Sequence, residues 1–167
     1  FGLRGVRNHR RRGFDSECLT MAGEEIIKVG TQRTLEANGS SCSNNSIVQA
    51  DDASYGVVAD GSSYPDAEFA LTVTYSVAPT EGTLISLYAR VLNIDGTADT
   101  DVPEATMPGY VVGSFVVNNT TSAQTLWLYA QDVPLEADYY IHNNGTGQTI
   151  SSGWVLKVKP RSRAPAP

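Results

Sequence analysis

The sequence predicts an all-β protein: an antiparallel β-sandwich, a jelly roll of about eight strands, with an extended N-terminal arm and a C-terminal tail. Apolar and polar residues alternate with a period of two in several segments, which is typical of half-buried strands. Short runs rich in Gly, Asn, Asp and Ser separate these segments, as turns do between strands. None of the segments has a convincing helical period, so two packed antiparallel sheets accommodate them best.

The longest alternating segment covers residues 83–94, in which Ile85 and Leu87 share one face. An acidic, proline-containing excursion follows over residues 97–108, and the β pattern resumes at residues 110–117. We therefore expect two long strands joined by an exposed loop, which is where a β-sandwich makes contacts. The loop residues expected to contact a partner are Asp99, Asp101 and Glu104.

The other strands are shorter and lie between turn signals. We expect them at residues 24–29, 46–50, 55–59, 67–77, 125–129, 137–141 and 153–159. Asp51 and Asp52 are expected to form a turn, and a Pro/Gly turn is expected to join strands 67–77 and 83–94 as a hairpin. Residues 143–147 give the sharpest turn signal and are expected to need a positive φ at a glycine.

The 167 residues suit one domain with an extension at each end. We assign residues 1–22 to a basic arm, residues 23–160 to the sandwich and residues 161–167 to a Pro-rich tail. The tail has polyproline II character and is not expected to add to the sheet. Met21-Ala-Gly-Glu-Glu is typical of a translation start, which would make residues 1–20 an upstream extension.

Charge is segregated between the two ends and the body. The net charge is -6, yet the arm holds five of the 12 Lys and Arg residues. An acidic body argues against nucleic acid as a partner, and without a run of about 18 apolar residues no membrane span is predicted. The basic ends are therefore expected to lie along neighbouring protein subunits. The residues expected to bind a partner there are Phe1, Arg4, Arg7, Arg10, Arg11, Arg12, Phe14, Arg161 and Arg163.

Groups that could carry catalysis are sparse, and the sequence predicts no catalytic residue and no cofactor. His9 and His142 are isolated from each other and from Cys-based motifs, so structural roles are expected for both. The glutamates fall at strand edges or in loops, where solvated acids are usual, and no pair of them is identified as a hydrolytic pair. They are Glu68, Glu81, Glu104 and Glu136.

The sequence predicts no metal site either. Asp51, Asp52, Asp60 and Asp66 suggest calcium, but without a ligand ladder they are better explained as solvated turn acids. Cys18 and Cys42 lack metal-type spacing; a disulfide between them is the less favoured alternative to two free thiols.

Aromatic side chains are the remaining candidates for a site. Exposed Tyr and Trp side chains would supply a platform for a sugar ring. Trp127 and Trp154 alternate with apolar neighbours, however, and are expected in the core.

Several segments resemble a known class of virion protein. They are Leu84-Ile-Ser-Leu-Tyr-Ala-Arg90 with Leu92-Asn-Ile-Asp-Gly96, then Gly113-Ser-Phe-Val-Val117, then residues 140–158 with Asn143-Asn-Gly-Thr-Gly147. In this order the segments resemble small virion proteins of tailed bacteriophages, and above all the jelly-roll cement (decoration) proteins of their capsids. The resemblance covers about residues 45–160.

The resemblance implies a protein without enzymatic activity that is made in the host cytoplasm and sits on the capsid exterior. It implies the major capsid protein as the partner, bridging of neighbouring capsid subunits, and a homodimer or other homo-oligomer. The alternative is a carbohydrate- or receptor-binding β-sandwich module of a phage tail fibre or spike. A sandwich hydrolase is a third hypothesis. Hundreds of copies per virion would favour a cement protein, whereas a dozen or fewer would favour a tail component.

Overall fold

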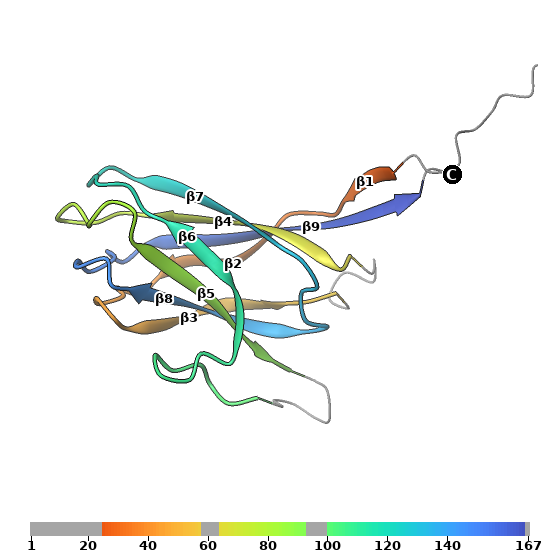
Figure 1. Cartoon of the computed structure of the whole chain (residues 1–167), viewed down its shortest axis with the longest axis horizontal. Coiled ribbons are helices and arrows are strands. Elements are labelled where there is room, and N and C mark those ends of the chain that lie inside the picture. The colour runs from red at the N-terminus through yellow and green to blue at the C-terminus, as the bar shows by residue number, and fades with distance from the viewer. Residues whose placement is uncertain (1–24, 58–63, 93–99, 166–167) are drawn as a thin grey trace, which may run out of the picture.

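The computed structural model describes residues 25–57, 64–92 and 100–165, which form nine strands in two antiparallel sheets (Figure 1). The strands are β1 (Glu25–Val29), β2 (Arg33–Gly39), β3 (Ile47–Tyr55), β4 (Asp66–Val73), β5 (Leu84–Val91), β6 (Tyr110–Val116), β7 (Gln124–Ala130), β8 (Ala137–Asn144) and β9 (Trp154–Pro165). In these ranges no helix is long and apolar enough to cross a membrane.

The strand order is that of a jelly roll. One sheet has the order β1-β9-β4-β7 with β2 also paired to β9, and the other has the order β3-β8-β5-β6. From β2 to β9 the chain changes sheet at each connection except β5–β6, and the first strands lie beside the last, as in two Greek keys. The predicted pairing of the two long strands is confirmed as β5–β6. The hairpin predicted between β4 and β5 is wrong, because they belong to different sheets.

The core lies between the sheets and is built from alternate side chains of each strand. Phe69, Leu71 and Val73 of β4 face Ile85 and Leu87 of β5, and all of them are buried. Aromatic rings also pack there, with centroids 5.2 Å apart for Phe69 and Tyr139. Burial confirms the apolar face predicted for Ile85 and Leu87 and the first part of the strand predicted at residues 67–77. That strand ends at Val73, however, and Val77 is 56% exposed, so its predicted last part is wrong.

Two strands differ from the prediction because their pairing is interrupted by bulges. β2 was not predicted at all, and it pairs with β9 through register shifts around Glu36. β3 continues through Asp51 and Asp52 to Tyr55, with a shift between Ala50 and Tyr55, so the predicted turn there is wrong. The strand expected at residues 55–59 is also wrong: Tyr55 ends β3, Gly56 and Val57 lie outside any strand, and residues 58–59 lie outside the described ranges. A bulge breaks the period-two pattern on which a strand prediction depends.

The C-terminal segment corrects the prediction of a tail that adds nothing to the sheet. β9 runs through Pro160 to Pro165 and pairs with β1, from Glu25 opposite Pro165 to Val29 opposite Arg161. The carbonyl of Pro160 accepts a hydrogen bond from Gly30 N at 2.9 Å, so it points toward the link between β1 and β2. In an antiparallel ladder the N–H of a residue points to the same side as its carbonyl. The N–H that proline lacks would therefore face this link and not β4, and no hydrogen bond to β4 is lost. We call β1 and residues 161–165 the ribbon; it extends from one end of the sandwich (Figure 1).

The turn predicted at residues 143–147 is confirmed. Gly145 and Gly147 have φ values of 79° and 78°, in the region that favours glycine. Asn143 is fully buried beneath the turn, and its Oδ1 accepts a hydrogen bond from Thr146 Oγ1 at 2.5 Å. Its Nδ2 donates to Gln148 O at 2.7 Å, which ties the two sides of the turn together.

Candidate binding face

The outer face of the sheet that contains β9, β4 and β7 carries an exposed aromatic side chain beside charged ones. In one row of this face Trp127 on β7 lies next to Ala70 on β4, which lies next to Lys157 on β9. In the following row Tyr129 lies next to Glu68, which lies next to Lys159. The sheet order therefore gathers side chains that are widely separated in the sequence.

Trp127 is 63% exposed, so its predicted place in the core is wrong. It lies on β7 at the sheet edge, where Gln124, Leu126 and Ala130 point inward and are buried. The prediction for Trp154 is confirmed, since that side chain is buried and its Nε1 donates to Ser40 O at 2.7 Å.

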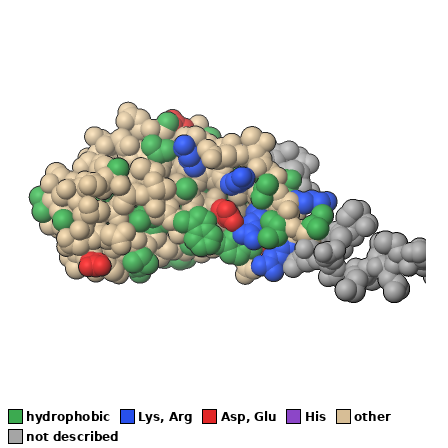
Figure 2. All heavy atoms as spheres, turned by 90° about the horizontal axis from the view of Figure 1, so that it is seen from above, with side chains coloured by type: hydrophobic (Ala, Val, Ile, Leu, Met, Phe, Trp, Pro, Cys, Tyr) green, Lys and Arg blue, Asp and Glu red, His purple; other side chains and the backbone are tan. Residues whose placement is uncertain are grey.

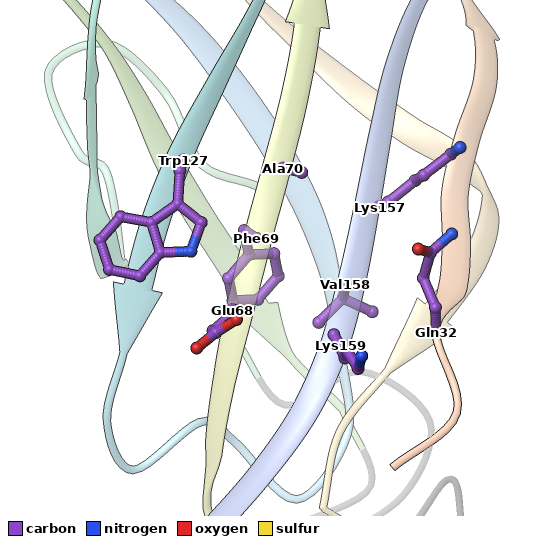
Figure 3. Close-up of a pocket in the computed structure, with 8 residues that line it drawn as sticks. All are labelled: Gln32, Glu68, Phe69, Ala70, Trp127, Lys157, Val158 and Lys159. Atoms are coloured by element: carbon purple, nitrogen blue, oxygen red, sulfur yellow. The ribbon is translucent and has the colours of Figure 1, made fainter. Parts of the chain in front are cut away.

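A shallow pocket of about 150 Å³ lies on this face (Figure 3). It is lined by Gln32, Glu68, Phe69, Ala70, Trp127, Lys157, Val158 and Lys159. Figure 3 shows the indole of Trp127 on one side of Ala70, and Lys157 with Gln32 on the other. The short side chain of Ala70 leaves the space between them open. We call these residues the Trp127 face.

One end of the Trp127 face is fixed by a network of polar contacts. Arg161 contacts Glu68 with 2.6 Å between Nη1 and Oε1, and its guanidinium lies 5.0 Å from the ring centroid of Tyr129. The hydroxyl of Tyr129 donates to Asp66 Oδ2 at 2.7 Å. Arg161, which was expected to bind a partner, is thus a half-buried side chain with contacts inside its own sheet, and its binding to a partner stays a prediction.

The two lysines of the Trp127 face differ from Arg161. Lys157 and Lys159 are both exposed, and no ion pair joins either of them to an acid in the described part of the chain. In Figure 2 Lys and Arg side chains gather in one half of the view, beside hydrophobic and acidic ones. Because the chain as a whole is acidic, these basic side chains form a local positive region, which favours an anionic ligand.

The ribbon is a second exposed surface with apolar side chains. Ile27 and Val29 lie on the same side of β1 and are 57% and 55% exposed. Arg163 lies opposite Ile27 on β9 and is exposed as well.

The other predicted contact residues lie apart from the ribbon or outside the described ranges. Asp101 and Glu104 are exposed in the segment between β5 and β6, where the backbones of Glu104 and Met107 exchange two hydrogen bonds of 3.0 Å. This segment connects two strands of the sheet that does not contain the ribbon. The remaining predicted contact residues lie outside the described ranges; they are Asp99, Phe1, Arg4, Arg7, Arg10, Arg11, Arg12 and Phe14.

An acidic cluster that sequence reasoning missed joins the two sheets. One carboxylate oxygen from each of Glu36, Asp51 and Asp52 lies within 4.8 Å of the others. Glu36 is buried and accepts hydrogen bonds from the backbone N–H groups of Asn38 and Asp51, at 2.8 and 3.1 Å. Asp52 likewise accepts from the N–H of Ala37 at 2.6 Å. Backbone donors thus already use the carboxylates of Glu36 and Asp52, as they do at turns and bulges. Asp66, part of the calcium hypothesis, lies in the Tyr129 network instead.

His142 is placed as a structural residue, as predicted. Its Nδ1 lies 3.0 Å from the hydroxyl of Tyr88, and the hydroxyl of Ser86, the residue opposite His142 on β5, lies 3.2 Å from that of Ser114. Cys42 is a buried free thiol whose pKa is raised by burial. Its proposed disulfide partner Cys18, like His9, lies outside the described ranges.

Comparisons with known proteins give one finding. A scan against models of protein families finds no match, and a search of curated proteins finds none either. Among solved structures, a family 6 carbohydrate-binding module is 14% identical, covers 86% of this chain and 95% of its own, and has a TM-score of 0.37. At that identity and score, the assignment of the jelly roll rests on the strand order of this chain.

Proposed function

We propose that the protein is a structural protein of a bacteriophage virion, without enzymatic activity. In this proposal it is a cement (decoration) protein that binds the outer surface of the capsid and bridges major capsid protein subunits, as a homodimer or other homo-oligomer. The observation that supports this most is the ribbon.

The ribbon has the properties of a segment that is completed by a partner. Beyond Arg161, which lies opposite Asp66, β9 pairs only with β1 in the described part of the chain. A two-stranded ribbon is marginally stable in water by itself, and its open edges offer backbone groups to another chain. The exposed Ile27 and Val29 add an apolar surface. Burial of such side chains contributes about 25 cal/mol per Å² of apolar area, which suits permanent attachment.

The location of the ribbon suits the charges of the two ends. Residues 1–24 lead directly into β1, and β9 ends beside it, so the basic arm joins the sandwich at the ribbon. A partner surface with carboxylates next to an apolar groove fits this arrangement.

The first experiment is a count of copies on purified particles of the phage that encodes the chain, by mass measurement. Hundreds of copies per particle support a cement protein, and a dozen or fewer support a tail component. Absence from the particles contradicts both.

The second experiment tests the ribbon. Wild-type protein and an I27D/V29D variant are added to empty heads that lack the protein. We expect a folded variant with markedly lower occupancy, because charged groups replace the apolar surface. A variant with Asp at the exposed Leu135, outside the ribbon, is the matched control and should decorate normally. Equal occupancy of all three proteins would contradict a role for the ribbon.

A second candidate function is supported by the Trp127 face. An exposed indole beside a shallow pocket with polar edges is the arrangement that suits recognition of a sugar ring. Under this candidate the protein is a carbohydrate- or receptor-binding module of a tail fibre or spike. A glycan titration of wild-type and W127A proteins tests it, and binding that is unaffected by W127A would contradict it.

A further inference from the structure

We infer that the Trp127 face binds an acidic saccharide, in which a sugar ring lies on the indole of Trp127 and a carboxylate of the same saccharide lies at Lys157 and Lys159. This inference rests on the second candidate function above and specifies the class of its ligand. It is compatible with a protein that also sits on a capsid.

The platform for the ring is the exposed side chain of Trp127. A pyranose has a face of C–H groups that packs on an aromatic ring, while its hydroxyls stay at the edge where they can find polar partners. Ala70, next to Trp127 in the sheet, leaves room for such a ring. The pocket of about 150 Å³ is smaller than the roughly 300–1,000 Å³ of enclosed small-molecule sites, so one sugar unit at the surface fits it.

The cations lie across Ala70 from Trp127, so a saccharide that begins on the indole reaches them by extending over the pocket. Trp127 and Lys157 flank Ala70 on neighbouring strands, so their Cα atoms are about 10 Å apart, two inter-strand spacings. Lys157 and Lys159 point from the same face of β9, about 7 Å apart along the strand. Figure 3 shows Lys157 leaning away from Trp127 with Gln32 beside it, which leaves the pocket floor open to a ligand.

The charge of the lining favours an anion. It contains two lysines and one glutamate, a net charge of +1 (2 − 1), on a chain whose net charge is -6. Glu68 is already paired with Arg161 at 2.6 Å, so its charge is compensated before a ligand arrives. The lysine charges have no such partner among the described residues, and a sugar carboxylate would provide one.

Single-stranded nucleic acid is the other ligand that combines stacking with negative charge. Proteins that bind it offer several aromatic platforms along a basic groove, one for each successive base. The described part of this face offers one open platform, because the ring of Tyr129 is covered by Arg161. A single stacking position beside two cations fits a sugar acid better than a run of nucleotides.

The experiment compares tetragalacturonate, its fully methyl-esterified form and an oligothymidylate as ligands of the full chain. Binding is followed by calorimetry and tryptophan fluorescence. Since Trp154 is buried and Trp127 exposed, a change of emission on binding reports Trp127. We expect the acid to bind at least about tenfold more tightly than the ester at low salt, the effect of one charge-assisted hydrogen bond.

The variants separate platform from charge. W127A should lose both sugar ligands, whereas K157Q/K159Q should lower the affinity for the acid to that for the ester and leave the ester unchanged. K28Q removes the exposed lysine of β1, outside the pocket, and is the matched control for the single variants K157Q and K159Q. It should bind like the wild type.

Each outcome decides a separate point. Equal affinity for acid and ester, or an unchanged K157Q/K159Q variant, would overturn the acidic class and leave the carbohydrate-binding function standing. If neither sugar produced heat or a change in tryptophan fluorescence, both the acidic ligand class and the carbohydrate-binding function would be overturned. Tighter binding of the oligothymidylate than of tetragalacturonate would assign the face to nucleic acid and overturn the inference.

Discussion

At the scale of single residues, His142 is a buried polar side chain whose charge state is linked to folding. The residue is 5% exposed, its Nδ1 is bonded to Tyr88, and its Nε2 has no partner among the described residues. Burial lowers the pKa of His142, because the charged imidazolium loses its hydration. Burial also raises the pKa of Tyr75 to about 12 and that of Tyr139 further still, so both phenols stay neutral in the fold.

The lowered pKa of His142 predicts loss of stability in mild acid. Below about pH 6.5 the unfolded chain binds a proton at His142 that the folded chain resists, so the free energy of unfolding falls as the pH falls toward the folded pKa. In H142Q this part of the pH dependence should disappear. Urea unfolding at pH 7.5 and 5.5 measures it, with H9Q as the control that removes the other histidine. An unchanged slope in H142Q would contradict the assignment.

Glu36 is a second buried polar residue, and it links the two sheets. Its carboxylate, on β2, accepts the N–H of Asp51 on β3 as well as that of Asn38. A hydrogen bond to a charged acceptor contributes about 1.5–3 kcal/mol. The role of Glu36 therefore follows from the register shifts in β2 and β3, which free these N–H groups from the ladder.

We predict that E36A lowers the free energy of unfolding by about 1–3 kcal/mol or more, because two N–H groups lose their acceptor. D101A removes an exposed carboxylate and should change the stability by less than about 0.5 kcal/mol. Chemical denaturation of both variants measures the difference. If E36A were as stable as D101A, water would have to satisfy the freed donors.

The Trp127 face also shows why its residues could not be predicted from sequence patterns alone. Leu126, Trp127 and Leu128 are all apolar, so alternation cannot tell which side of the strand faces the core. The register of β7 against β4 decides this, because Leu126 lies opposite the buried Leu71 and Trp127 lies opposite Ala70 on the outer face. The pocket itself joins residues of three strands and Gln32, a set that follows only from the strand order.

At the scale of elements, most strands could be predicted because their inner faces are regular. β4 alternates in burial over most of its length, Ile85, Leu87 and Ala89 share the inner face of β5, and the turn at Gly145 has a clear signal. The strands that were missed or broken, β2 and β3, are those with shifts in register. The last part of β9 was not predicted because proline normally ends a strand. Here Pro160 is tolerated because the side of the strand on which it lacks an N–H faces the link between β1 and β2.

The ribbon gives the prediction at this scale. A chain that ends after Arg161 keeps the contact with Glu68 but loses all pairs of β1 except Val29 with Arg161. We expect the amides of residues 25–28 to lose protection from hydrogen exchange, while β4 and β8 stay protected. A chain that ends after Pro165 is the control. Persistent protection of residues 25–28 in the shorter chain would show that another segment pairs with β1.

At the scale of the whole molecule, the protein consists of a sandwich body and a ribbon at one end, to which the basic arm is joined. The jelly roll buries its apolar side chains between two sheets, and the chain as a whole has a net charge of -6. The basic arm, the exposed Ile27 and Val29 and the end of β9 are all joined at the ribbon. The Trp127 face lies on the outer side of the same sheet. The proposed capsid contact and the proposed sugar contact therefore use different parts of one sheet.

The last prediction concerns the arm. Residues 1–20 contain five arginines against Asp15 and Glu17, and exposed ion pairs contribute only about 0–1 kcal/mol each. Any electrostatic attachment must therefore come from several pairs together and must weaken as salt screens them. Deletion of residues 1–20 should leave a folded sandwich that decorates empty heads less fully than the whole chain does at low salt.

The salt dependence separates the arm from the ribbon. Occupancy by the whole chain should fall as salt is raised from about 0.05 to 0.5 M, across which the screening length shrinks from about 14 to 4 Å. The deleted protein should start lower and depend less on salt, because its remaining contact is the apolar surface of Ile27 and Val29. An I27D/V29D variant should instead lose occupancy at every salt concentration. If the deleted and whole proteins gave the same occupancy throughout, the arm would make no contribution, and attachment would depend on the ribbon alone.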